Sequence, residues 1–173
     1  MDRHLKSFIN KETVDDVKTW VFGLFNNGLL PKNQFCSEGV RFGNNIRSLN
    51  ITPPKCYFDI YDKVISEVED IIGSPIESQS IGHSIMYHRD GAVIETHIDP
   101  RMSIYPVYRC NILISKPRLG GEPTFQEKPL EVNEGDLWTF YGYTENHGAK
   151  MTKGNIDRVL LSFSFDVKPK NSS

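Results

Sequence analysis

The chain has 173 residues, a formal net charge of −2, 38% hydrophobic residues and 24% charged residues. These values are those of one globular domain and exclude a disordered, collagenous or coiled-coil chain. No stretch approaches the roughly 20 apolar residues of a membrane helix, and the first 20 residues lack the apolar core of a secretion signal. An isoelectric point near 6.2 disfavours nucleic acid as a partner. The three cysteines, Cys36, Cys56 and Cys110, have no disulfide or zinc spacing, so we expect reduced thiols and a cytoplasmic location.

The first 75 residues have the apolar spacing of amphipathic helices. Apolar residues recur every three or four positions from Val14 to Phe25, and Asn10 is a candidate N-cap. A second helix is expected after Pro53-Pro54, with an apolar face that runs from Tyr57 to Ile72. We expect both faces to pack in the core.

After Pro75 the apolar period shortens to about two, which indicates β-strands separated by glycine-containing turns. The expected strands span residues 79–87, 92–98, 106–115, 123–126, 129–132, 136–141 and 158–167. This many short strands favours a β-sandwich or jelly roll with the helices packed outside. We therefore predict a mainly β single domain with flanking α-helices. Residues 1–75 would be helical support, 76–167 the β core, and 168–173 a polar tail.

Three residues in the strand region have the chemistry of a metal site. His97 and Asp99 lie two residues apart near the end of an expected strand, so their side chains share a face. His147 follows 48 residues after Asp99. Two imidazoles and one carboxylate are the facial ligand set of non-haem Fe(II) oxygenases, which leaves open positions on the metal. A His-x-Asp pair is also common on protein surfaces, and that interpretation competes with the metal site.

Arg158 begins the last expected strand and shares one face of it with Leu160, Ser162 and Ser164. A buried arginine is costly unless it meets an anion, and its planar fork matches a carboxylate. Either a bound anion or an internal salt bridge would satisfy it.

Several motifs follow one another in a recognisable order: Tyr87, His97-Ile98-Asp99, Arg109, Gly120-Gly121-Glu122-Pro123-Thr124-Phe125, Gly135-Asp136-Leu137, His147-Gly148 and Arg158. In this order, residues 79–167 resemble the Fe(II)- and 2-oxoglutarate-dependent dioxygenases, most closely the prolyl-hydroxylase branch. The segments YRCNILI and RVLLSFSF are also similar to the aspartyl/asparaginyl hydroxylase branch. The resemblance implies a double-stranded β-helix, a cupin-like jelly roll.

The resemblance also implies roles for individual residues. His97, Asp99 and His147 would bind iron, and Arg158 would bind the distal carboxylate of 2-oxoglutarate. Tyr87 would donate its hydroxyl to the same carboxylate, because the serine that many relatives carry two residues after the arginine is replaced here by Leu160. Arg109 or Asn111 would contact the other end of the cosubstrate, or the substrate.

By the same resemblance, the cofactors would be Fe(II), 2-oxoglutarate and O2, with ascorbate as a further candidate, and the coproducts succinate and CO2. The expected reaction is hydroxylation of an amino-acid or peptidyl (prolyl-type) side chain. Arg101 and Arg109 suggest a carboxylate-bearing substrate, or are simply surface charges. Residues 100–106 and 33–50 are candidate segments of the active-site rim. Two alternatives remain: a nucleic-acid demethylase of the same superfamily, and a non-catalytic metal-binding jelly-roll module.

Overall fold

The structure is a computed structural model. It describes residues 3–32, 41–76, 78–101 and 105–167. The predicted polar tail and Cys36 lie outside these residues, as do parts of the two predicted rim segments, residues 33–40 and 102–104.

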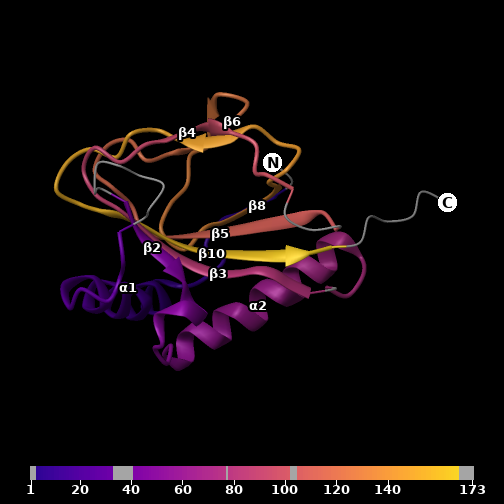
Figure 1. Ribbon diagram of the computed structural model, residues 1–173, viewed down its shortest axis with the longest axis horizontal. Helices are drawn as coiled ribbons and strands as arrows, with labels where there is room; N and C mark the ends of the chain where they lie inside the picture. The colour runs from indigo at the N-terminus through magenta and orange to yellow at the C-terminus, as the bar shows by residue number, and fades with distance from the viewer. Residues whose placement is uncertain (1–2, 33–40, 77, 102–104, 168–173) are drawn as a thin grey trace.

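The described strands form two antiparallel sheets (Figure 1). The large sheet has the strand order β1-β8-β5-β10-β3-β2, and the small sheet has the order β4-β9-β6-β7. The strands of the large sheet are β1 (Arg3–Leu5), β2 (Arg41–Asn45), β3 (Ser78–His88), β5 (Val107–Ser115), β8 (Leu137–Tyr141) and β10 (Arg158–Asp166). Those of the small sheet are β4 (Ile94–His97), β6 (Pro123–Phe125), β7 (Lys128–Pro129) and β9 (His147–Ala149).

Helices α1 (Lys11–Asn26) and α2 (Lys55–Ile72) lie along one face of the large sheet (Figure 1). The side chain of Asn10 accepts a hydrogen bond from the backbone N–H of Thr13 at 2.9 Å, which confirms the predicted N-cap. Helix α2 ends at Gly73, whose φ of 66° is readily adopted by glycine. A short 3₁₀ helix, η1 (Ile46–Leu49), follows β2.

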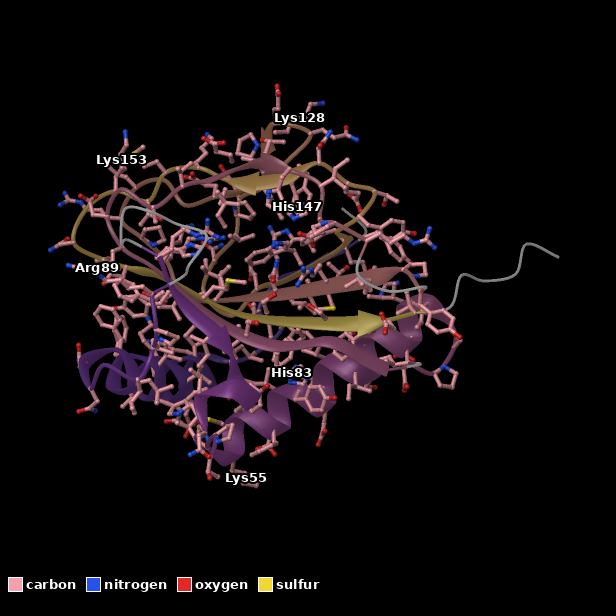
Figure 2. The ribbon with its side chains drawn as sticks, viewed as in Figure 1. Lys55, His83, Arg89, Lys128, His147 and Lys153 are labelled. Carbon is pink, nitrogen blue, oxygen red and sulfur yellow. The ribbon has the colours of Figure 1, made fainter. Side chains whose placement is uncertain are left out.

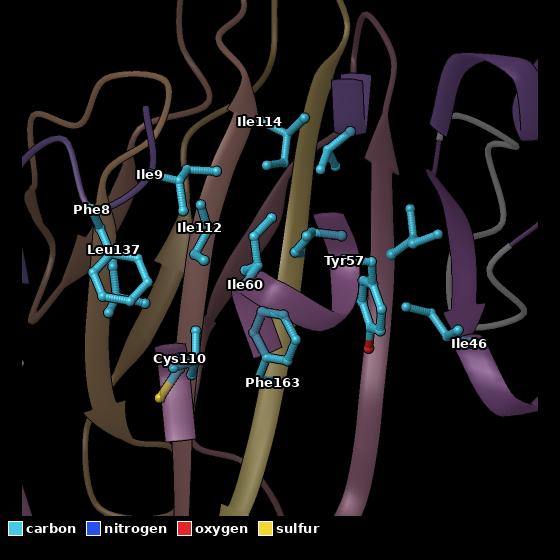
Figure 3. Close-up of a cluster of buried hydrophobic side chains, with 14 of the residues drawn as sticks. Phe8, Ile9, Ile46, Tyr57, Ile60, Cys110, Ile112, Ile114, Leu137 and Phe163 are labelled. Atoms are coloured by element: carbon cyan, nitrogen blue, oxygen red, sulfur yellow. The ribbon is translucent and has the colours of Figure 1, made fainter. Parts of the chain in front are cut away.

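The large sheet is apolar on both faces. On the helix side, Ile60 of α2 packs in one cluster with Ile112 of β5 and Phe163 of β10 (Figure 3). On the other side, Trp138, Phe140 and Leu160 form a smaller cluster that Phe125 of the small sheet covers in part. This double burial explains why every residue of β10 is buried. The site described below lies on the second face.

The prediction that residues 1–75 are helices and loops is wrong at two places. Strand β1 pairs with β8, and β2 pairs with β3, so both add to the large sheet. Neither segment shows the alternation of apolar residues that indicates a strand. Strand β9 was also not predicted, and the strands expected at 92–98 and 129–132 are shorter, Ile94–His97 and Lys128–Pro129. No helix within the described ranges is long and apolar enough to cross a membrane.

Candidate active site

Two histidine rings lie side by side on neighbouring strands of the small sheet. His97 of β4 and His147 of β9 are register partners, and their ring centroids lie 4.4 Å apart. Each ring Nδ1 lies 2.8 Å from a backbone carbonyl oxygen two residues earlier, that of Glu95 or Glu145. Because a carbonyl only accepts, each Nδ1 carries a proton, so in the neutral form of each ring the lone pair lies on Nε2. Figure 2 shows His147 between the two sheets.

Asp99 brings a carboxylate to the same place. Its Oδ1 lies 3.5 Å from Nε2 of His97 and 3.7 Å from Nε2 of His147. The candidate ligand atoms of the three residues all lie within 4.8 Å of one another. The backbone N–H of Asp99 donates to the carbonyl of Gly142 at 2.8 Å, which fixes the residue just beyond the end of β4. The donor set suits a divalent first-row metal such as Fe(II).

Burial holds His147 in the form that a metal requires. It lowers the pKa of this ring to about 4, although the charge of Asp99 acts in the opposite direction and raises it. The imidazole is therefore neutral at pH 7, and its Nε2 is free of a proton.

Arg109 orients Asp99. Its Nε and Nη2 lie 2.9 and 2.8 Å from Oδ2 of Asp99, and its Nη1 donates to Oγ of Ser164 at 2.8 Å. Arg109, which was predicted to contact the cosubstrate or the substrate, thus contacts a candidate metal ligand directly. Carboxylates that bind metals are commonly held in this way by a second residue.

The three candidate ligands open onto a cavity of about 130 Å³ between the sheets. The small sheet contributes Ile94, Phe125 and Gly148 in addition to the two histidines. The large sheet contributes Asn111, Trp138, Phe140, Leu160 and Ser162. Asn111 and Arg109 both line this space, as expected from their shared strand face.

Arg158 also lines this cavity and is 2% exposed. Its Nη1 donates to Nδ1 of His88 at 3.0 Å, and its Nε is buried without a hydrogen-bond partner in the described part of the chain. Burial and the nearby charge of Arg41 together lower the pKa of Arg158 to about 10, and the charge of Glu122 opposes them. The guanidinium therefore remains charged at neutral pH. A Cβ on Gly121, from the predicted Gly-Gly motif, would lie only 2.9 Å from Cδ of Arg158.

Tyr87 does not belong to this cavity, which contradicts its predicted contact with the cosubstrate. Its ring packs in the helix-side cluster, stacked on Phe25 at 4.1 Å between centroids. Its hydroxyl donates to Oδ2 of Asp157 at 2.8 Å. Successive strand residues point to opposite faces, so Met86 and His88 face the cavity side and Tyr87 faces the helices.

Arg101 lies beside the candidate metal site. It lines a separate small cavity of about 30 Å³ together with Asp99, Tyr105 and Tyr143. This position suits a substrate contact near the metal but is apart from the main cavity.

Two further residues belong to the site, and neither was singled out individually from the sequence. His88 is 2% exposed and accepts a hydrogen bond from Arg158. Burial and the charges of Arg158 and Arg41 hold the pKa of His88 well below its usual value, so it is a neutral acceptor. Arg41 lies in the predicted rim segment 33–50 and lines the cavity, but it does so from β2, a strand that the sequence pattern did not predict.

Solved structures of similar fold were found, whereas no protein-family model and no curated protein sequence matches the chain. A prolyl hydroxylase from Trichoplax adhaerens, in complex with a fragment of a hypoxia inducible factor oxygen degradation domain, has a TM-score of 0.76. The two chains are 13% identical, over 95% of this chain and 82% of that one. The α-ketoglutarate-dependent epimerase SnoN of nogalamycin biosynthesis has a TM-score of 0.75 at 13% identity, over 98% and 81% of the two chains. HygX from Streptomyces hygroscopicus, with nickel, 2-oxoglutarate and hygromycin B bound, has a TM-score of 0.68 at 12% identity, over 97% and 82%.

At this level of identity the likeness concerns the fold. The described sheets and helices agree with the predicted mainly β class, and the neighbours confirm the predicted resemblance at that level. The chain therefore has the jelly-roll fold of the Fe(II)- and 2-oxoglutarate-dependent oxygenases, in a form similar to the prolyl hydroxylases.

Proposed function

We propose that this protein is an Fe(II)- and 2-oxoglutarate-dependent oxygenase that hydroxylates an amino-acid or peptidyl side chain. One observation carries the proposal. The convergent donor atoms of His97, Asp99 and His147 and the buried guanidinium of Arg158 line the same cavity. A redox metal and a dicarboxylate cosubstrate require this pair of features in one space.

The residues present fit both groups. His97, Asp99 and His147 would hold Fe(II), because Oδ1 of Asp99 faces the Nε2 atoms of both rings and the candidate ligand atoms converge. The buried Nε of Arg158, which has no hydrogen-bond partner in the described residues, would donate to the distal carboxylate of 2-oxoglutarate. When bound with O2, these groups supply an oxidation that converts 2-oxoglutarate to succinate and CO2.

The chain itself would orient and shield the reaction. Arg109 holds Asp99 in place through its Oδ2 atom. His88 holds one nitrogen of Arg158 and leaves the others for the ligand. The apolar side chains of Met86, Phe140 and Leu160 line the space and exclude water from it.

The ligands of the neighbours and one arginine beside the site support a substrate class. The Trichoplax enzyme is complexed with a peptide, and HygX with hygromycin B. Here Arg101 lies beside Asp99 in the small neighbouring cavity, where it would attract a carboxylate of an amino acid or peptide. Hydroxylation of a prolyl-type side chain is the first candidate.

Anaerobic addition of Fe(II) and 2-oxoglutarate tests the core of the proposal. The wild-type protein should give a weak visible charge-transfer band and, with air, form succinate. Asp99→Ala should abolish both signals, whereas Asp62→Ala, at an exposed position of α2, should change neither. Absence of both signals in the wild-type protein would overturn the proposal. Tight stoichiometric zinc that 2-oxoglutarate leaves unaffected would instead indicate a non-catalytic module.

A screen for succinate formation against free amino acids and peptides would identify the substrate. A product heavier by one oxygen atom supports hydroxylation. A product of unchanged mass and altered stereochemistry would contradict it and indicate an epimerase instead.

A further inference from the structure

Two arginines and a histidine form one row across three neighbouring strands of the large sheet. His88 of β3 is the register partner of Arg41 on β2 and also of Arg158 on β10. Residues directly opposite each other on neighbouring strands project to the same face of a sheet. Arg41 and Arg158 accordingly both line the cavity that also holds the candidate metal ligands.

Neither guanidinium is fully satisfied. The Nε atoms of Arg41 and of Arg158 are both buried, and neither has a hydrogen-bond partner among the described residues. Glu122 is the acidic group whose charge acts on Arg158, yet its own Oε2 is buried without a partner in the same part of the chain. Buried donors of this kind normally meet an acceptor, so these groups would bind an anion that enters the cavity.

The charges of the row are also unbalanced. His88 is a neutral acceptor between the cations Arg41 and Arg158, and its Nδ1 accepts a hydrogen bond from Arg158. Two like charges in a partly buried space repel each other, because little water screens them. A carboxylate placed against both would remove that repulsion. Its two oxygens offer about four acceptor sites, enough to accept hydrogen bonds from two guanidinium groups.

We propose that Arg41 contributes a second guanidinium to the cosubstrate site and, together with Arg158, binds the distal carboxylate of 2-oxoglutarate. This inference rests on the proposed function. It supplies the hydrogen bond that the sequence analysis required of Tyr87, whose hydroxyl is engaged by Asp157 on the other face of the sheet. The apolar Leu160, which also lines the cavity, offers no hydrogen bond.

Calorimetric titration of the Mn(II)-loaded protein tests the role of Arg41. Arg41→Met should weaken 2-oxoglutarate binding by about tenfold to a hundredfold, the usual effect of losing a charge-assisted hydrogen bond. Arg41→Lys should recover part of this loss, because it keeps the charge without the fork. Binding of 2-oxovalerate, which lacks the distal carboxylate, should be the same in all variants. Arg118→Met removes an equal charge from an exposed position and should leave both affinities unchanged.

Thermal unfolding without ligand separates this role from a structural one. Without ligand, the thermal unfolding midpoint of Arg41→Met should equal or exceed that of wild type, because the variant lacks one of two cations that repel each other. The increase in midpoint that 2-oxoglutarate produces should be smaller in the variant than in wild type. A lower ligand-free midpoint together with wild-type affinity would show that Arg41 is only structural. Equal losses for 2-oxoglutarate and 2-oxovalerate would also overturn the inference. Failure of the wild-type protein to bind 2-oxoglutarate would instead overturn the proposed function.

Discussion

Arg109 holds one carboxylate oxygen of Asp99 and leaves the other facing two histidine rings. The Nε and Nη2 atoms of Arg109 lie 2.9 and 2.8 Å from Oδ2. Oδ1 is the oxygen that lies 3.5 and 3.7 Å from the two histidine Nε2 atoms. The two oxygens therefore have separate partners, and the direction in which Asp99 offers a ligand is set by a residue on β5.

Arg109→Met should weaken binding of a divalent metal by about tenfold to a hundredfold, the usual effect of removing the residue that holds a ligand. Calorimetric titration with Mn(II) measures this directly. Ser164→Ala is the matched control, since it removes only the partner of Nη1 and should cost clearly less. An affinity for Mn(II) that is the same in Arg109→Met and wild type would show that Asp99 needs no support.

Gly142→Ala should abolish metal binding while the fold remains. A Cβ at this position would overlap Oδ2 of Asp99 and would lie 3.3 Å from Cγ of Arg109, so the carboxylate must move. Circular dichroism would check the fold and Mn(II) titration the site. Gly23→Ala is the control, because nothing lies within 4 Å of a Cβ there and alanine favours a helix. Unchanged metal affinity in Gly142→Ala would mean that the Asp99 carboxylate can move without weakening metal binding.

Tyr87→Phe should reduce stability and leave the affinity for 2-oxoglutarate within about twofold of wild type. The hydroxyl donates to Asp157 and contacts no part of the cavity, so its loss should cost about 1 kcal/mol of unfolding free energy. Urea unfolding and calorimetric titration measure the two quantities on the same sample. A large loss of 2-oxoglutarate affinity would restore the role that the sequence analysis assigned to Tyr87.

The candidate metal ligands could be predicted from a His-x-Asp pair together with the order of motifs that ends in His147 and Arg158. His97 and Asp99 are two residues apart, and His147 begins a short strand that pairs with the strand of His97. Alternation along a strand is nevertheless only part of the reason, because β4 ends at His97. The hydrogen bond from the backbone of Asp99 to Gly142, far along the chain, completes the placement.

The end of the cavity that is lined by Arg158 and Arg41 was predicted only in part. Arg158 was found because it begins a long strand, Arg158–Asp166, whose residues could be assigned to two alternating faces from the sequence. Strand β3 is apolar on both faces, with Ile85 toward the helices and Met86 toward the cavity, so its pattern does not say on which side Tyr87 lies. Arg41 lies on a strand whose sequence, RFGNN, has no apolar alternation, and only the pairing with β3 brings it to the site.

Asp136 should make the stability of the fold depend on acidic pH. Its carboxylate accepts from the backbone N–H groups of Ser7 at 2.8 Å and Asn133 at 2.9 Å, and from Nε2 of His4 at 3.0 Å. Burial alone would raise the pKa of this carboxyl, but these three contacts outweigh burial and hold it below its usual 3.8. The contacts attach β1 and the following turn to the segment that leads into β8.

Because the folded pKa of Asp136 is depressed, the charged form stabilises the fold above pH 3.8, and this contribution is lost as the pH falls through the folded pKa. Asp136→Asn should therefore lower the unfolding free energy by about 1–3 kcal/mol at pH 6. The difference from wild type should shrink below about pH 4. Urea unfolding from pH 6 to pH 3 measures it, with Asp62→Asn on the exposed side of α2 as the control. A difference that stays constant down to pH 3 would show that the hydrogen bonds of Asp136 do not depend on its charge.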